Sequence, residues 1–178
     1  MKKILNDPLL TGARAILYIT MAAIGAGIAA LTAGIAIALI RPGLIFEELN
    51  HKVPIQPGAD EATLFAGVFA LMIILFALLF FFFRYMLRIV GSVAAGDPFT
   101  PINATRLTAM GWLMLAVQLV SIPAVALIIR LTNQLGEDPG TVDSAINFNG
   151  IILVITLFIL ARVFRQGSAM RDDLEGTV

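Results

Sequence analysis

The chain has 178 residues, of which 59% are hydrophobic and only 13% are charged. Soluble domains are usually about 45–50% apolar and roughly 25% charged, and a soluble domain of this length could not bury so much apolar surface. The mean hydropathy of +0.94 therefore indicates a protein that is solvated largely by lipid. Twelve basic residues balance twelve acidic ones, so the net charge says nothing about nucleic acid, and we expect no direct binding of it. The absence of Cys excludes disulfides and thiolate chemistry.

Four apolar segments stand out along the chain, at about residues 15–40, 62–83, 108–129 and 146–164. A helix rises about 1.5 Å per residue, so about 20 residues cross a hydrocarbon layer of about 30 Å. The first segment is far longer than the apolar region of a cleaved signal peptide, and we expect it to be retained. The pattern predicts an all-α fold, an integral membrane four-helix bundle that forms one domain over residues 1–178.

The positions of the basic residues predict the orientation of the bundle. Nine of them fall at the two ends of the chain and between the second and third segments: Lys2, Lys3, Arg14, Arg84, Arg88, Arg106, Arg162, Arg165 and Arg171. The other three are Arg41, Lys52 and Arg130. Because short loops rich in Lys and Arg stay in the cytoplasm, we expect both termini inside the cell, in a bacterial inner membrane.

The helices are expected to continue beyond the lipid on the cytoplasmic side. Helical composition extends past the second segment to about Ala95, where Gly96 and Pro98 predict a stop. Thr100 and Pro101 predict a new start, since Thr is a fair N-cap and Pro is favoured at the first helical position. With a third helix ending near residue 131 and a fourth near residue 175, the sequence predicts a cytoplasmic stub.

Within the spans, three features have alternative interpretations. Small residues four apart, Ala26, Ala30 and Gly34, predict either helix packing inside the bundle or a homo-oligomer interface. Gln118, near Pro123, must avoid lipid, so it predicts an interhelical hydrogen bond or else a small polar pocket or conduction route. The run at residues 80–85, FFFFRY, predicts an interfacial anchor or a lipid-specific or ligand-gated site.

The cytoplasmic loop and tail carry the candidate functional residues. The loop candidates are Asp97, Phe99, Asn103 and Arg106, and the tail candidates are Phe164, Arg165, Arg171, Asp173 and Glu175. We expect the tail to lie against the loop, with Phe99, Met170 and Leu174 providing most of the attachment. The tail acids are expected to pair with Arg84, Arg88, Arg106 or Arg165. Such a cluster is either a structural clasp or a docking surface for a cytoplasmic protein.

The loop stretch GDPFTPINATRL at residues 96–107 with Gly111-Trp112, and the tail VFRQGSAMRDDLEGTV at residues 163–178, resemble a bacterial domain-of-unknown-function family of four-span membrane proteins. The spans match this family only in length and hydrophobicity. Its members lack an assigned activity and are often encoded beside a helix-turn-helix repressor of the Cro/CI type, so the resemblance implies a regulatory partnership. Arg162 departs from the family pattern, in which an acidic residue is expected.

No motif for nucleotide binding, hydrolysis or zinc binding is present, and we expect neither enzymatic activity nor a metal or cofactor. His51, near Glu47 and Glu48, is interpreted as a solvated loop residue rather than a metal ligand. The leading hypothesis is a non-enzymatic inner-membrane sensor or anchor that engages a cytoplasmic partner, such as a transcriptional repressor. The alternatives are a small oligomeric transporter or channel and an accessory subunit of a larger membrane complex.

Overall fold

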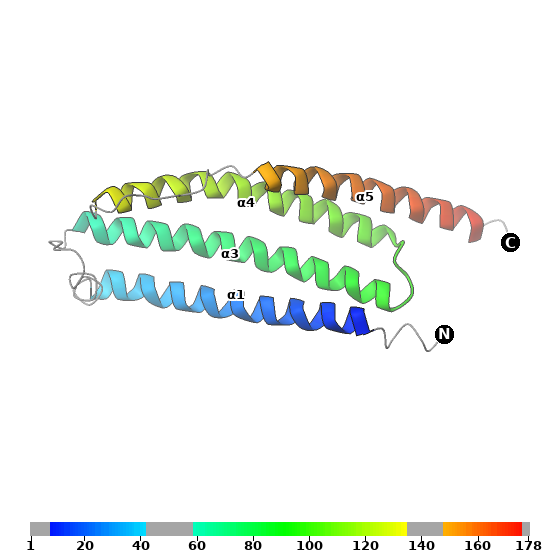
Figure 1. Ribbon diagram of the computed structural model, residues 1–178, viewed down its shortest axis with the longest axis horizontal. Coiled ribbons are helices and arrows are strands. Elements are labelled where there is room, and N and C mark those ends of the chain that lie inside the picture. Colours follow the sequence, from blue (N-terminus) through cyan, green and yellow to red (C-terminus); the bar gives the residue numbers. More distant parts are fainter. Residues whose placement is uncertain (1–7, 42–58, 135–147, 176–178) are drawn as a thin grey trace. The chain divides into compact units, whose positions relative to one another are not determined.

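The computed structural model describes residues 8–41, 59–134 and 148–175. These residues form four helices, α1 (Pro8–Ile40), α3 (Ala59–Ala94), α4 (Pro101–Gln134) and α5 (Phe148–Glu175), arranged as a helical bundle (Figure 1). Each of the four is long and apolar enough to cross a membrane. Lipid offers no hydrogen-bond partners to a polypeptide backbone, so a helix that satisfies its own backbone is the stable form of such a segment. The chain is a multi-pass membrane protein, as the sequence predicts, while His51 and its neighbouring acids lie outside the described residues.

The helices are longer than the apolar segments. They contain 33, 36, 34 and 28 residues in chain order, whereas about 20 suffice to cross the hydrocarbon layer. The ends near the central loop agree with the expected ones, since α3 ends at Ala94 and α4 begins at Pro101. The start of α1 differs, because it begins at Pro8 rather than near Ala15. Proline is compatible with the first helical position, where no backbone N–H is needed.

The described helices divide into two compact units. The first contains α1 as far as Ile24, α3 from Leu78, α4 as far as Ala116, and α5. The second contains the rest of α1, α3 as far as Ala77, and α4 from Val117. Of the nine basic residues assigned to the cytoplasmic side, Lys2 and Lys3 lie outside the described residues, and the other seven all belong to the first unit. The described Arg41 and Arg130 belong to the second unit.

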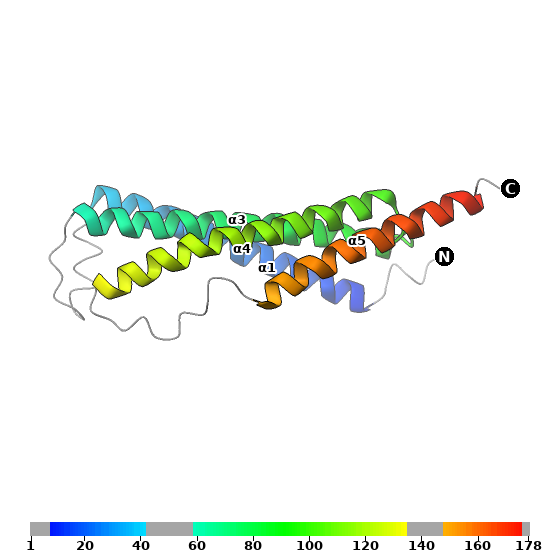
Figure 2. The ribbon, with the colours of Figure 1, turned by 90° about the horizontal axis from the view of Figure 1, so that it is seen from above.

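The core of the first unit lies where α4 and α5 pack against each other. Leu107 and Met110 of α4 and Leu157 and Ala161 of α5 form a buried cluster. Partly buried side chains pack against it from α3, α4 and α5: Phe82, Tyr85, Ile89, Met114 and Phe164. Figures 1 and 2 show α4 and α5 side by side and antiparallel in this unit. On α5 the buried positions follow a spacing of three and four residues, which places them on one face of the helix: Gly150, Val154, Leu157, Ala161 and Ser168.

In the second unit, α1 and α3 meet through two glycine–phenylalanine contacts. A Cβ atom added to Gly27 would lie 2.6 Å from Cε2 of Phe76, and one added to Gly34 would lie 2.9 Å from Cε2 of Phe69. The two glycines are seven residues apart, and so are the two phenylalanines, in antiparallel order. The same contact therefore repeats after two helical turns, which brings the helix axes close together at both levels.

This contact changes the interpretation of the small residues in α1. Gly34 packs against α3 as the bundle-packing prediction requires, but Ala26 and Ala30 are exposed. A spacing of four drifts around a helix of 3.6 residues per turn, so the three residues do not share the packed face. In the second unit, α1 packs on α3 through Gly27 and Gly34, whereas Ala26 and Ala30 are exposed.

Gln118 is buried in the second unit, with 8% of its surface exposed. Burial within protein is what an uncharged amide in a membrane span requires, because lipid cannot hydrogen-bond to it. One turn along the helix, Ser121 Oγ donates a hydrogen bond to the Gln118 backbone carbonyl at 2.8 Å, and α4 continues through Pro123.

Candidate functional site: a loop–tail contact

The connection between α3 and α4 is a tight turn whose geometry comes from one glycine. Gly96 has a φ of +83°, a conformation that costs other residues energy. Its N–H donates to the Val93 carbonyl at 3.0 Å, and the Asp97 N–H donates to the Ser92 carbonyl at 3.1 Å. This pair of bonds is a Schellman motif, which satisfies the last carbonyls of α3. It ends the helix where the Gly-Asp-Pro sequence predicts a stop.

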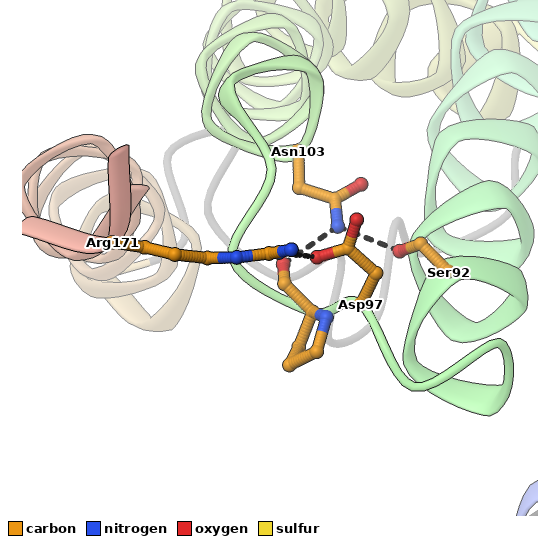
Figure 3. Close-up of polar contacts among 5 residues, drawn as sticks. Ser92, Asp97, Asn103 and Arg171 are labelled. Carbon is orange, nitrogen blue, oxygen red and sulfur yellow. Dashed lines mark hydrogen bonds and ion pairs between the residues drawn. The ribbon is translucent and has the colours of Figure 1, made fainter. Parts of the chain in front are cut away.

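Asn103 lies in the first turn of α4, and its side chain stabilises the connection between α3 and α4 (Figure 3). Its side chain has no exposed surface. The Nδ2 group donates to Ser92 Oγ at 2.6 Å and to the Pro98 carbonyl at 2.8 Å. One amide therefore links the end of α3, the loop and the start of α4.

Arg106 completes this network from the surface. Its Nη1 atom donates to Asn103 Oδ1 at 3.0 Å and to the Arg88 carbonyl at 3.3 Å. The guanidinium thus satisfies the acceptor side of the buried amide and crosses to α3. Thr100 behaves differently from the N-cap prediction, because its buried hydroxyl has no hydrogen-bond partner in the described part of the chain. Its backbone carbonyl accepts the first hydrogen bond of α4, from the Asn103 N–H at 3.0 Å.

Phe99 extends from the loop onto α5. Its ring lies 5.2 Å from that of Phe164, centroid to centroid, with a tilt of 39°. The same ring covers Gly167, where an added Cβ would lie only 2.9 Å from Phe99 Cδ1. Phe164 and Gly167 are three residues apart and therefore share a helix face. On this face the Phe99 ring packs against the Phe164 ring and fills the space that a side chain at position 167 would occupy.

An ion pair joins the loop to α5 one turn further along (Figure 3). Arg171 Nη1 donates to Asp97 Oδ1, with 46% and 44% of the two side chains exposed. A pair this exposed contributes about 0–1 kcal/mol, while an aromatic pair contributes about 0.5–1.5 kcal/mol. We call the set Asp97, Phe99, Phe164, Gly167 and Arg171 the loop–tail contact. Its attachment comes more from the aromatic packing than from the ion pair.

The structure brings together six of the nine predicted loop and tail residues. Asp97, Phe99, Asn103, Arg106, Phe164 and Arg171 are joined as described above. The Arg165 side chain is exposed and lines a cavity between α4 and α5. Asp173 is exposed, and Glu175 is the last residue of α5.

One detail of the predicted contact is wrong. Met170 and Leu174, expected to pack on Phe99, are 62% and 72% exposed. Met170 follows the buried Ser168 by two residues, which places it about 200° around the helix from the packed face. The structure also contains an ion pair that the sequence did not predict, in which the tail supplies the cation, Arg171, and the loop supplies the acid, Asp97.

Sequence reasoning missed Gly167, Ser92 and Ser168. Gly167 carries a signal that could have identified it, because a glycine inside a helix costs about 1 kcal/mol relative to Ala and is often retained for close packing. Ser92 and Ser168 carry no sequence signal of this kind, since a serine in an amphipathic helix usually faces water.

The loop–tail contact combines charged and aromatic groups. Its polar groups are a carboxylate and a guanidinium, which form hydrogen bonds, and its aromatic rings offer apolar contact area. Among the described residues, no group of three or more His, Cys, Asp or Glu side chains is placed to hold a metal ion. Surfaces of this mixed aromatic and arginine composition are typical of protein–protein contacts.

The profile of a family described as "Protein of unknown function (DUF2975)" matches residues 52–178, which include α3, the loop, α4 and α5. The chain belongs to this family. The resemblance read from the loop and tail is thereby confirmed, although the match does not reach α1. No curated protein and no solved structure matches the chain. Every residue of the loop–tail contact lies within the DUF2975 region.

Proposed function

We propose that this protein is a non-enzymatic membrane sensor or anchor whose loop–tail contact, with the side chains around it, engages a cytoplasmic protein. The observation that carries the proposal is the combination of a fixed scaffold with exposed apolar side chains. Asn103 and Phe99 hold the loop on α3 and α5, while Ile102, Met170 and Leu174 are 55%, 62% and 72% exposed.

The location of these side chains supports a protein partner. They lie at the ends of α4 and α5 beyond the longest apolar runs, in the unit that contains the seven described basic residues of the inner side. An apolar side chain there gains nothing from water, and exposed apolar groups beside charged ones are a common feature of binding surfaces. A helix-turn-helix repressor is the partner that the family resemblance implies, with the membrane protein holding it away from DNA.

A pull-down tests the proposal with the detergent-solubilised full chain as bait and the cytosol of its own host as prey. Met170→Gln combined with Leu174→Gln removes apolar contact area without adding charge. Asp172→Asn is the control, because Asp172 is exposed and lies about 200° around α5 from Met170.

We expect one cytosolic protein to be enriched by the wild type and by the Asp172→Asn control, and to be lost from the double glutamine variant. Addition of the purified captured protein should then shift the wild-type chain, but not the double variant, in size-exclusion chromatography. The proposal fails if no cytosolic protein is enriched over empty detergent micelles. It also fails if the double variant captures the same protein as well as the wild type does.

A further inference from the structure

A cavity of about 470 Å³ lies between α4 and α5, outside the loop–tail contact. Its lining consists of Thr108 from α4 and of five α5 residues: Phe158, Ala161, Arg162, Arg165 and Gln166. The α5 residues fall on one helix face, since Phe158, Arg162 and Arg165 follow each other at spacings of four and three. Its volume lies within the range of small-molecule binding sites.

The floor of this cavity is fixed by packing. A Cβ atom added to Gly111 would lie 3.1 Å from Cε1 of Phe158, so the absence of a side chain at Gly111 lets the Phe158 ring sit against α4. Trp112 meets this ring edge-on, with centroids 5.5 Å apart. Ala161 is 97% buried, which closes the base of the cavity.

The charge of the cavity is unbalanced. Arg162 and Arg165 are exposed, and neither guanidinium has a hydrogen-bond or ion-pair partner in the part of the chain that the structure describes. None of the lining residues is acidic. Two guanidinium groups on one wall repel each other, and an anion between them would remove that repulsion. Phosphate is the anion that a guanidinium matches best, because its oxygens accept two parallel N–H bonds.

The surroundings indicate that this phosphate belongs to a lipid. On α5, the exposed Ile155 and Ile159 precede Arg162 at helical spacing, so the face changes from apolar to basic at Arg162. Trp112 is 61% exposed beside the cavity and also lines a second cavity with Phe81, Tyr85, Ala109 and Leu113. An exposed tryptophan at the edge of an apolar region is typical of the headgroup level of a membrane.

We infer that an anionic phospholipid binds here, with its phosphate between Arg162 and Arg165 and an acyl chain along Phe158 and Trp112. Basic pockets between membrane helices are known binding sites for anionic headgroups. The Thr108 hydroxyl donates to the Ala104 carbonyl at 2.9 Å, so toward the cavity it offers only a hydrogen-bond acceptor. A headgroup that carries hydroxyl donors, such as that of phosphatidylglycerol, complements this acceptor and both cations.

Trp112 is the only tryptophan of the chain, which makes it a probe beside the site. The full chain is reconstituted in phosphatidylcholine vesicles that contain a small fraction of phosphatidylglycerol with brominated acyl chains, and quenching of Trp112 fluorescence is measured. Brominated phosphatidylcholine at the same fraction gives the reference for random lipid contact. We expect a relative affinity for phosphatidylglycerol on the order of tenfold, since each basic group near an anionic surface contributes about 1 kcal/mol.

Matched variants separate the site from general electrostatics. Arg162→Gln with Arg165→Gln should reduce quenching by phosphatidylglycerol to the phosphatidylcholine level. Arg84→Gln with Arg88→Gln removes the same charge from exposed positions on α3 of the same unit and should leave most of the selectivity. Equal quenching by both lipids in the wild type, or equal loss in both double variants, would overturn the inference. Complete loss of the selectivity for phosphatidylglycerol on adding millimolar inorganic phosphate at constant ionic strength would also overturn the inference, because the site would then bind free phosphate.

Discussion

Asn103 connects three segments through one buried amide, so its loss should cost more than that of any exposed polar residue near it. We expect Asn103→Leu to destabilise the protein by about 2–3 kcal/mol, because the Pro98 carbonyl and Ser92 Oγ would lose their donor and Arg106 an acceptor. Thermal unfolding in detergent measures the effect. Thr105→Ala, at an exposed position two residues away, is the control and should stay within about 0.5 kcal/mol of the wild type.

Gly167 should be intolerant of any side chain, because Phe99 occupies the space where a Cβ would lie. We expect Gly167→Leu to displace the Phe99 ring from Phe164 and to weaken the loop–tail contact by about 1 kcal/mol. Tryptic cleavage after Arg171 should then become on the order of fivefold faster.

Gly25→Leu is the control for this experiment, since nothing lies within 4 Å of a Cβ built at Gly25. It should leave the cleavage rate after Arg171 unchanged. Equal cleavage rates for the Gly167 variant and the wild type would mean that Phe99 does not hold the tail.

At this scale the sequence predicted residue types better than residue partners. Composition and position were enough to select Asp97, Phe99, Asn103 and Arg106, because charged, aromatic and amide side chains stand out in a short loop between two apolar segments. Their partners depend on how far α5 is rotated about its own axis. That rotation is set by the packing of Leu157 and Ala161 against α4, which no local pattern in the tail reveals.

At the scale of the helix, the contact between α1 and α3 depends on Gly27 and Gly34. We expect Gly27→Leu and Gly34→Leu each to destabilise the bundle by about 1–3 kcal/mol, because the added side chains meet the rings of Phe76 and Phe69. The two effects should be nearly additive, since the sites are about 10 Å apart along α1 and share no partner. Unfolding by a denaturing detergent, followed by circular dichroism, gives the measurement.

Ala26 and Ala30 test the alternative that α1 forms a homo-oligomer interface. Both are exposed in the single chain, so Ala26→Leu and Ala30→Leu should leave its unfolding midpoint unchanged. Light scattering of the solubilised protein then distinguishes the two roles of this face. A decrease in oligomer mass for Ala30→Leu would identify an interface between chains, whereas an unchanged mass would identify a face that contacts lipid.

The two helix ends next to the loop were predictable from the sequence, whereas the packed faces of the helices were not. The Gly96 and Pro101 signals act within a few residues, and they place the end of α3 and the start of α4 correctly. A face is different in a membrane helix, because apolar residues occur on the lipid side as well as on the packed side. In α1 this left only the small residues as a guide, and a spacing of four selected the exposed alanines together with Gly34.

For the molecule as a whole, the distribution of basic residues predicts that the loop and the C-terminus lie in the cytoplasm. Reporter fusions at Pro98 and after the last residue should therefore give cytoplasmic signals. Fusions near Gln56 and Pro139, which lie outside the described residues, should give external ones. A cytoplasmic signal at Gln56 would refute the orientation, because loops with few basic residues are expected on the outer side.

The fold class followed from composition, because four long apolar segments in a short chain have one stable arrangement in lipid. The cavity with Arg162 and Arg165 did not follow, although both residues were visible in the sequence. Its walls come from two helices, and its floor depends on Gly111, whose packing role appears only when Phe158 is placed against it.

The ion pair between Asp97 and Arg171 joins residues that are 74 positions apart in the chain. At a synthesis rate of about 5–20 residues per second, α5 is therefore completed several seconds or longer after the loop, and the loop–tail contact cannot form before then. The contact between α1 and α3 can form before α5 is synthesised, because both helices precede the loop. A partner that recognises the loop together with the tail can consequently bind only chains whose synthesis has passed α5, and it would leave truncated or stalled chains unoccupied in the membrane.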